Sequence, residues 1–192
     1  QHALAPDASL RCAAQVKRRP LGRSCAVLDI GGYLNNSQAQ EVTARHLLRA
    51  GILLFLLGLF TGFVVPIVTN PRMGLSSHLE GVTNGMLLVV LGLLWPRLRL
   101  SARSFAVAFW LAIYSTYANW ATTLLAAAMG AGETNMPLAA AGHRGSPFQE
   151  ALITVGLVSL SIGVVVSCAI VLWGLRDRDS ATAARQEGGP SP

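Results

Sequence analysis

Four long apolar runs constrain this sequence more than any other feature. They lie at residues 50–69, 78–95, 105–132 and 151–175, and Glu80 is the one charged side chain among them. Each run approaches or exceeds the roughly 20 residues that cross the hydrocarbon core of a bilayer as a helix. A helix satisfies its own backbone hydrogen bonds in lipid. The runs therefore predict an all-α fold, an integral-membrane four-helix bundle with spans at about 48–69, 77–95, 104–131 and 147–175.

The placement of basic residues predicts the orientation of these spans. Charged residues make up only 12% of the chain, whereas soluble domains carry about 25%. Of the 15 Lys and Arg residues, all but Arg72 and Arg144 lie on one side of the predicted spans. Basic residues collect on the cytoplasmic side of a membrane. We therefore expect a multi-pass protein of the cell inner membrane with both termini in the cytoplasm. The net charge of +6 then reflects topology and needs no nucleic-acid partner.

The chain outside the spans is predicted to be peripheral. Residues 37–176 would form the membrane domain. Residues 1–36 are of mixed composition and are expected to be disordered or to lie on the membrane surface, and residues 177–192 read as a disordered polar tail. The three cysteines are scattered, in a spacing that fits neither a disulfide framework nor a zinc site.

The start of the second run combines several polar groups. Ser77 and Glu80 match the S-x-x-E capping box, which predicts that a helix begins at Ser77. His78 would then lie in the first turn, where the helix dipole favours the neutral imidazole that binds metals. Asn84 lies one turn after Glu80. Two interpretations stay open: a functional polar site, or a helix cap, an interhelical hydrogen bond and a histidine facing interfacial water.

The third run is polar in its middle. Eight polar or amphipathic residues lie within ten positions: Tyr114, Ser115, Thr116, Tyr117, Asn119, Trp120, Thr122 and Thr123. Polar groups at membrane depth need partners from facing helices or from a ligand. Such a dense belt favours a pocket between the second and third helices, near the outer mouth of the bundle, over simple interhelical hydrogen bonding.

The first and fourth runs carry small-residue patterns. Gly58 and Gly62 are spaced as G-x-x-x-G, and Ser159, Gly163 and Ser167 repeat at every fourth position. This spacing indicates a close helix–helix or subunit interface. The fourth helix is predicted to begin after residue 146, because a serine followed by proline and then glutamine is typical of a helix N-terminus.

Four segments of the chain resemble the integral-membrane hydroxylaminobenzene mutases. They are HLEGVTNGM (78–86), YANWATTLLAA (117–127), MPLAAAGHRG (136–145) and QE (149–150), and the likeness extends over about residues 46–176. That family shifts the hydroxyl oxygen of hydroxylaminobenzene from nitrogen to the ring, which makes 2-aminophenol. The resemblance implies an isomerase that acts on an aromatic hydroxylamine within the lipid bilayer.

A more distant similarity is to the bacterial styrene oxide isomerases. The histidine, the asparagine six residues later and an aromatic-Ala-Asn triplet correspond to His78, Asn84 and the 117–119 segment. This likeness implies a homotrimer with haem b between subunits and His78 as the axial ligand of the iron. Thr123 and Ser115 stand where those isomerases carry tyrosine and aspartate, which argues against epoxide isomerisation and favours the mutase interpretation.

The resemblance and the polar belt together yield a set of candidate residues. The expected catalytic side chains are Asn84, Tyr117, Asn119 and Glu80, and the expected substrate-binding side chains are Tyr114, Trp120 and Thr123. His78 is the expected haem ligand. Alternatives are an epoxide isomerase, a transporter or scaffold, and a haem protein that transfers electrons. The last would usually need two axial ligands, whereas His46 and His143 lie outside the predicted spans.

The predicted orientation can be tested by cysteine labelling in intact cells. Cysteine introduced at Ser76 or Gly145 should react with an impermeant maleimide added outside, because these positions lie on the side poor in basic residues. Cysteine introduced at Ser101 should stay unlabelled until the membrane is opened. The reverse pattern would place both termini outside.

Overall fold

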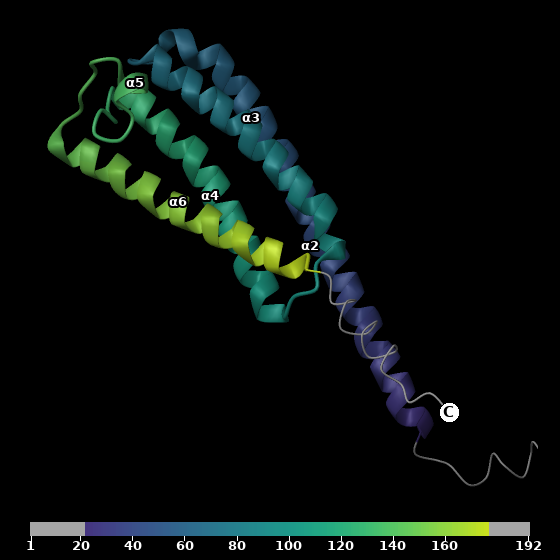
Figure 1. The fold of residues 1–192 in the computed structure, drawn as a ribbon. Coiled ribbons are helices and arrows are strands. Elements are labelled where there is room, and N and C mark those ends of the chain that lie inside the picture. The colour runs from purple at the N-terminus through teal and green to yellow at the C-terminus, as the bar shows by residue number, and fades with distance from the viewer. Residues whose placement is uncertain (1–21, 177–192) are drawn as a thin grey trace, which may run out of the picture. The chain divides into compact units, whose positions relative to one another are not determined.

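The computed structural model describes residues 22–176, with side chains from Gln38 onward. The chain divides into two compact units, residues 1–40 and 41–192. The long helices are α2 (Gly22–Val64), α3 (Pro71–Leu94), α4 (Ala102–Met129) and α6 (Pro147–Gly174), and the shorter elements are α5 (Pro137–Ala140), η2 (Val65–Ile67) and η3 (Trp95–Arg97) (Figure 1). The described residues contain no strand, so the predicted all-α fold is confirmed.

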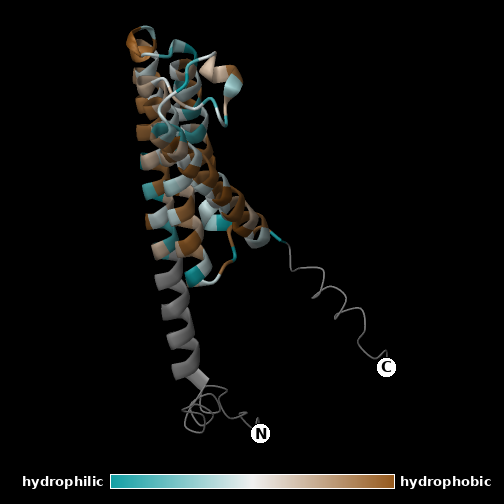
Figure 2. Ribbon diagram, turned by 90° about the vertical axis from the view of Figure 1, so that its left-hand side faces the viewer, coloured by the Kyte–Doolittle hydropathy of each residue, from teal (hydrophilic) through white to brown (hydrophobic). Residues whose placement is uncertain are grey.

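Three segments of the described chain are long and apolar enough to cross a membrane. They are Gln38–Ile67, Pro71–Arg97 and Pro147–Gly174. Helix α4 is as long as α6, at 28 residues, but it carries the polar belt in its middle. Figure 2 shows hydrophobic residues along the helices, as expected for helices that face lipid on one side and a helical core on the other.

Helix α3 begins one and a half turns earlier than the sequence predicted. Asn70 is its N-cap, because the side-chain Oδ1 accepts hydrogen bonds from the backbone N–H groups of Arg72 and Met73, and Pro71 follows at the first helical position. The predicted start at Ser77 is therefore wrong. Ser77 lies in the helix interior with no exposed surface, and its Oγ donates to the backbone oxygen of Trp120 at 3.1 Å.

This boundary also changes the position of His78. It is the eighth residue of α3 rather than a residue of the first turn. The helix dipole acts mainly on the terminal turn. The predicted dipole effect on the imidazole is therefore wrong, because His78 lies outside the terminal turn of α3.

Helix α2 is longer than the predicted first span. It begins at Gly22 and so includes part of the segment expected to be peripheral or disordered. Residues 1–21 and 177–192 lie outside the described residues, and the expectations for them stay predictions. The predicted start of the fourth helix is confirmed, because Ser146 and Gln149 form a reciprocal capping box at the N-terminus of α6.

Glycines bring α2 and α3 into backbone contact. A Cβ added to Gly58 would lie 2.5 Å from the backbone nitrogen of Val82, and one added to Gly85 would lie 2.6 Å from the backbone nitrogen of Phe55. Real Cβ atoms do not approach backbone so closely, so only glycine permits this spacing of the two helices. The predicted role of Gly58 in helix packing is thus confirmed, with α3 as the partner.

Helix α4 packs against α3 on one side and α6 on the other. The small residues of α6 form the second contact: Ser167 Oγ donates to the Ala108 oxygen at 2.9 Å, and Gly163 lies against the Ser115 hydroxyl. The predicted small-residue stripe therefore joins two helices of one chain. Since the stripe is occupied within the chain, it no longer argues for a subunit interface, and the trimer stays a prediction.

The α2–α3 contact predicts that Gly81→Ala destabilises the protein. The new Cβ would lie 2.5 Å from the Gly58 Cα. Overpacking of this kind costs about 1–3 kcal/mol. The midpoint of thermal unfolding in mild detergent should fall by several degrees. Ala121→Leu, which adds carbon to an exposed position of α4, is the control and should leave the midpoint in place. Equal midpoints for both variants would contradict the close contact.

Candidate functional site

Helices α2 and α4 both contact the first half of α3. Ser77 bonds to α4 through the Trp120 oxygen. A Cβ on Gly81 would lie 2.9 Å from Trp120 Cδ1 and 2.5 Å from the Gly58 Cα, so this short stretch of α3 touches both α2 and α4. The predicted site residues of α3 and α4 therefore lie on neighbouring helices.

A carboxylate and two amides form the centre of this region. The Glu80 Oε2 accepts a hydrogen bond from Asn84 Nδ2, one turn along α3, at 3.2 Å. The same oxygen accepts a second, short hydrogen bond from Asn119 Nδ2 of α4. All three side chains are half-buried. The structure thus brings together three residues that the sequence predicted as catalytic, around one shared oxygen atom.

This cluster lies deep along the helices. Glu80 is nine residues from the start of α3, and Asn119 is ten residues from the end of α4. At 1.5 Å per residue both are about 14–15 Å from the helix ends, near the middle of a core about 30 Å thick. An ionisable side chain at that depth is costly and is usually kept for function.

His78 turns toward α2 rather than toward the cluster. Its Nδ1 lies 2.8 Å from the backbone oxygen of Gly58. A carbonyl can only accept, so Nδ1 carries a proton, and in the neutral form of the ring the free lone pair is then on Nε2. Gly62 makes room for the ring, since a Cβ there would lie 3.0 Å from Nδ1. Orientation of a histidine by a backbone carbonyl is the usual support for a metal-binding Nε2.

Two of the predicted aromatic residues connect α4 to α2. The Tyr117 hydroxyl donates to the backbone oxygen of Ala50 at 2.8 Å. Trp120 Nε1 donates at 3.0 Å to the Thr61 hydroxyl, which itself donates to the Leu57 oxygen at 2.8 Å. Thr61 is buried and was missed by the sequence reasoning; a lone threonine in an apolar helix gives little signal. These bonds hold both rings in place, beside the polar cluster.

The two other predicted residues lie apart from the cluster. The Tyr114 hydroxyl is 2.8 Å from the Ser159 hydroxyl, which places this ring against α6. Thr123 is buried, and its hydroxyl donates to the backbone oxygens of Asn119 and Trp120, one turn back in α4. Within the described residues neither side chain bonds to Glu80, Asn84 or His78.

The donor set limits which cofactors the protein can hold. The described residues contain no group of three His, Cys, Asp or Glu side chains that could hold a metal ion. A metal held only by side chains needs such a group. Haem iron needs only one axial protein ligand. His78, with Nδ1 occupied and Nε2 free, fits that requirement.

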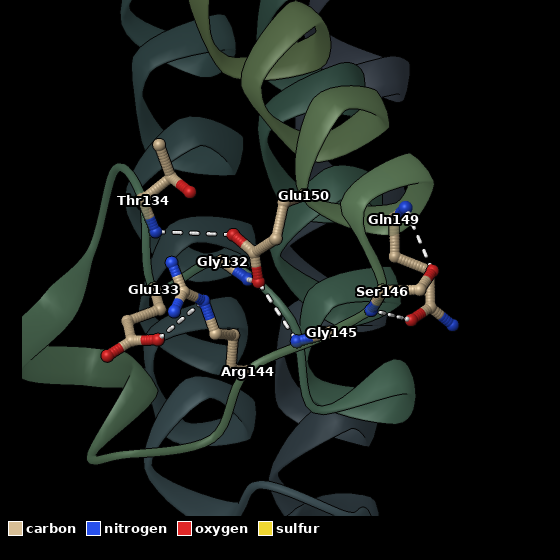
Figure 3. A network of polar contacts seen from close by, with 8 residues as sticks. All are labelled: Gly132, Glu133, Thr134, Arg144, Gly145, Ser146, Gln149 and Glu150. Atoms are coloured by element: carbon tan, nitrogen blue, oxygen red, sulfur yellow. Dashed lines mark hydrogen bonds and ion pairs between the residues drawn. The ribbon is translucent and has the colours of Figure 1, made fainter.

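A second carboxylate organises the loop between α4 and α6. Glu150, in the first turn of α6, is buried and accepts three backbone N–H bonds, from Gly132 at 2.9 Å, Gly145 at 3.0 Å and Thr134 at 3.2 Å (Figure 3). Both ends of the 130–146 loop are thereby tied to the helix. The sequence showed a glutamate after the helix cap but not its partners, since backbone donors leave no mark in a sequence.

Asn70 fixes the same end of the molecule from the α3 side. Its Nδ2 donates to the backbone oxygens of Ala139 and Ala140, and its backbone N–H donates to the Ala127 oxygen at 3.0 Å. One buried asparagine therefore joins the start of α3, the end of α4 and the short helix α5. The signal for it was present, since asparagine before proline is typical of a helix start.

Comparison with known proteins agrees with this arrangement. Residues 43–176 match the family described as styrene oxide isomerase. The hydroxylaminobenzene mutase HabB of Ectopseudomonas oleovorans is 56% identical over 158 residues, which cover 82% of this chain and 94% of that protein. The mutase HabA of the same organism is 48% identical over 130 residues, covering 68% and 96%. No solved structure matches.

The long apolar helices and the half-buried polar cluster between them fit a membrane protein that carries polar side chains between its helices. The chain belongs to the styrene oxide isomerase family, and its mutase relatives make it an isomerase. The resemblance drawn from the four sequence segments is thereby confirmed.

Variants of Glu150 and of its neighbour Glu133 test whether Glu150 holds the loop between α4 and α6. Glu150→Ala leaves three backbone donors without their acceptor, and a buried unsatisfied group costs about 1–3 kcal/mol. We expect a clear loss of stability and faster hydrogen exchange at Gly132, Thr134 and Gly145.

Glu133→Ala is the control for this prediction. It removes an exposed ion pair with Arg144 at 3.3 Å, and such pairs contribute about 0–1 kcal/mol. Similar exchange rates in the two variants would show that Glu150 does not hold the loop.

Proposed function

We propose that this protein is a membrane-bound mutase that converts hydroxylaminobenzene to 2-aminophenol. The observation that carries the proposal is the Glu80–Asn84–Asn119 cluster, in a chain closely related to two proteins named hydroxylaminobenzene mutases. The reaction is an isomerisation. The N–O bond breaks and a C–O bond forms at the neighbouring ring carbon, which loses its proton while the nitrogen gains one. No oxidant or reductant is required.

The cluster offers what the reacting end of the substrate needs. Breaking the N–O bond builds positive charge on nitrogen and the ring, and a carboxylate with two amides stabilises such charge in a medium of low dielectric. The Glu80 carboxylate can also accept the proton lost from the ring carbon and return one to nitrogen. Asn84 and Asn119 hold that carboxylate in place.

The apolar surroundings of the cluster serve the same chemistry. Bulk water would trap an electron-poor aromatic fragment and release other products, so the site must exclude it. Trp120 and Tyr117 present aromatic surface close to α3 and are held by their bonds to Thr61 and Ala50. Aromatic rings favour offset or edge contacts with a bound ring, so these two side chains are the proposed ring-binding residues. Tyr114 and Thr123 lie apart from the cluster and have no part in this proposal.

Haem b is the proposed cofactor, with His78 as its protein ligand through Nε2. Bound there, a ferric haem supplies a Lewis acid for the hydroxyl oxygen of the substrate. The Gly58 carbonyl fixes the histidine tautomer and ring orientation from the other side. Asn84, Asn119 and Glu80 act on the nitrogen end of the substrate and move its protons.

The membrane arrangement completes the proposal. Helix α4 can serve as a fourth span despite its polar belt, because the polar groups there bond to backbone oxygens or to neighbouring helices. We propose four spans, with both termini in the cytoplasm and the protein in the inner membrane, and the arginine distribution supports this orientation. The half-buried cluster at bilayer depth favours a homo-oligomer that covers it, a trimer by family resemblance.

The alternative of an electron-transfer haem protein needs a second axial ligand. His46 precedes Gly58 by 12 residues of α2, about 18 Å along the helix, and Gly58 is the residue that contacts His78. His143 is exposed in the outer loop. Neither can join His78 on one iron within this fold, so the described residues favour a single protein ligand and an open position for substrate.

Two histidine variants test the proposal. His78→Ala should lose the Soret band and the conversion of hydroxylaminobenzene to 2-aminophenol together, while membrane insertion is kept. His46→Ala, an exposed histidine on α2, is the control and should keep both. Full activity in preparations shown to lack haem would exclude the iron from the reaction, and loss of the Soret band in His46→Ala would favour the electron-transfer alternative.

A further inference from the structure

The polar cluster at bilayer depth has an unusual balance of donors and acceptors. A carboxylate accepts hydrogen bonds only. Both amide groups that contact Glu80 therefore present Nδ2 to it. In a planar amide the oxygen lies on the opposite arm, so the Oδ1 atoms of Asn84 and Asn119 face away from Glu80. Glu80 thus decides which way both amides are turned.

Three oxygen atoms of the cluster remain available. Within the described residues, Asn84 Oδ1, Asn119 Oδ1 and Glu80 Oε1 have no hydrogen-bond partner among the bonds found in the structure. They are not buried either, since Trp95 Nε1 is the one unpartnered side-chain atom that is buried in this part of the chain. Three accessible acceptors at membrane depth, where water is absent, need donors from a ligand.

We infer that Glu80 is a specificity-determining residue, which turns the two asparagine oxygens away from itself and makes the site an acceptor-only site for the N–H and O–H groups of the substrate. This inference rests on the proposed function. A hydroxylamine carries two such donor hydrogens, one on nitrogen and one on oxygen, and it fits a set of acceptors. An epoxide carries none, and its oxygen is repelled by them.

The inference explains why a chain of the styrene oxide isomerase family can differ in substrate from an epoxide isomerase. A site that bonds the donor hydrogens of its substrate rejects analogues that lack them, because its own polar groups stay unpaired. Specificity then depends on the polarity of one hydrogen-bonded triad rather than on the aromatic ring, which both substrates carry.

Glu80→Gln is the decisive variant, because it keeps the size of the side chain. The glutamine oxygen can still accept from both asparagines, while an N–H donor replaces the free Oε1. We expect kcat/KM for hydroxylaminobenzene to fall about 10- to 100-fold. The inhibition constant of styrene oxide, measured as a competitor in the same assay on the full-length protein, should fall by about 3- to 10-fold, that is, toward tighter binding.

A second variant tests the same idea without changing the charge. Asn84→Ala removes one of the outward acceptors. It should raise KM for hydroxylaminobenzene about 10-fold and leave the inhibition constant of styrene oxide unchanged or lower. Thr83→Ala is the control on the same helix, because the Thr83 hydroxyl is exposed and bonds only to backbone oxygens of its own helix. It should move neither constant.

The outcomes separate this inference from the function on which it rests. A wild-type protein that does not convert hydroxylaminobenzene would overturn the proposed function. An active wild type whose Glu80→Gln and Asn84→Ala variants handle both hydroxylaminobenzene and styrene oxide more weakly by the same factor, or handle both as the wild type does, would overturn the acceptor-only site alone. In Glu80→Gln, a lower kcat/KM for hydroxylaminobenzene together with tighter binding of styrene oxide supports it, because a purely structural role would weaken both.

Discussion

The absence of water at bilayer depth is the constraint on which the rest of this structure depends. Every polar group placed there has to find a partner in the protein or in a ligand. Ser77 and Tyr117 do so with backbone oxygens of neighbouring helices, and Trp120 does so with Thr61. Glu80 and the two asparagines leave one carboxylate oxygen and both amide oxygens without a partner among the described residues. The residues that stay unsatisfied are therefore the ones available for chemistry.

Close helix packing makes that arrangement possible. Gly58 and Gly81 let the backbones of α2 and α3 meet without side chains between them. Because of this approach, the Gly58 oxygen lies within hydrogen-bond distance of His78 and sets its tautomer. A larger residue at either glycine would separate the helices and release the histidine. The same glycines that stabilise the bundle thus prepare the proposed haem ligand.

Glu80 and Glu150 show how environment assigns a role to one residue type. Glu150 accepts three backbone donors from the loop between α4 and α6, and its charge is used to hold that loop (Figure 3). Glu80 accepts two amide donors on one oxygen and keeps the other free. A carboxylate saturated by backbone amides is preorganised but has little left to offer a substrate. Glu150 therefore acts on the loop, and Glu80 is the carboxylate with an oxygen left for a substrate.

The sequence by itself determined the helical class, the apolar segments and the family, because apolar periodicity, charge placement and local motifs are properties of neighbouring residues. It also named Glu80, Asn84 and Asn119 as a set. It misplaced the start of α3 at Ser77, because a serine followed three residues later by a glutamate gives the same sequence pattern at a helix cap and in a helix interior. It also missed Thr61. Only the tertiary structure decided that Asn70 caps α3, that His78 bonds to Gly58 and that both asparagines share one oxygen of Glu80. Those contacts join residues from different helices, and their geometry depends on how closely the helices pack.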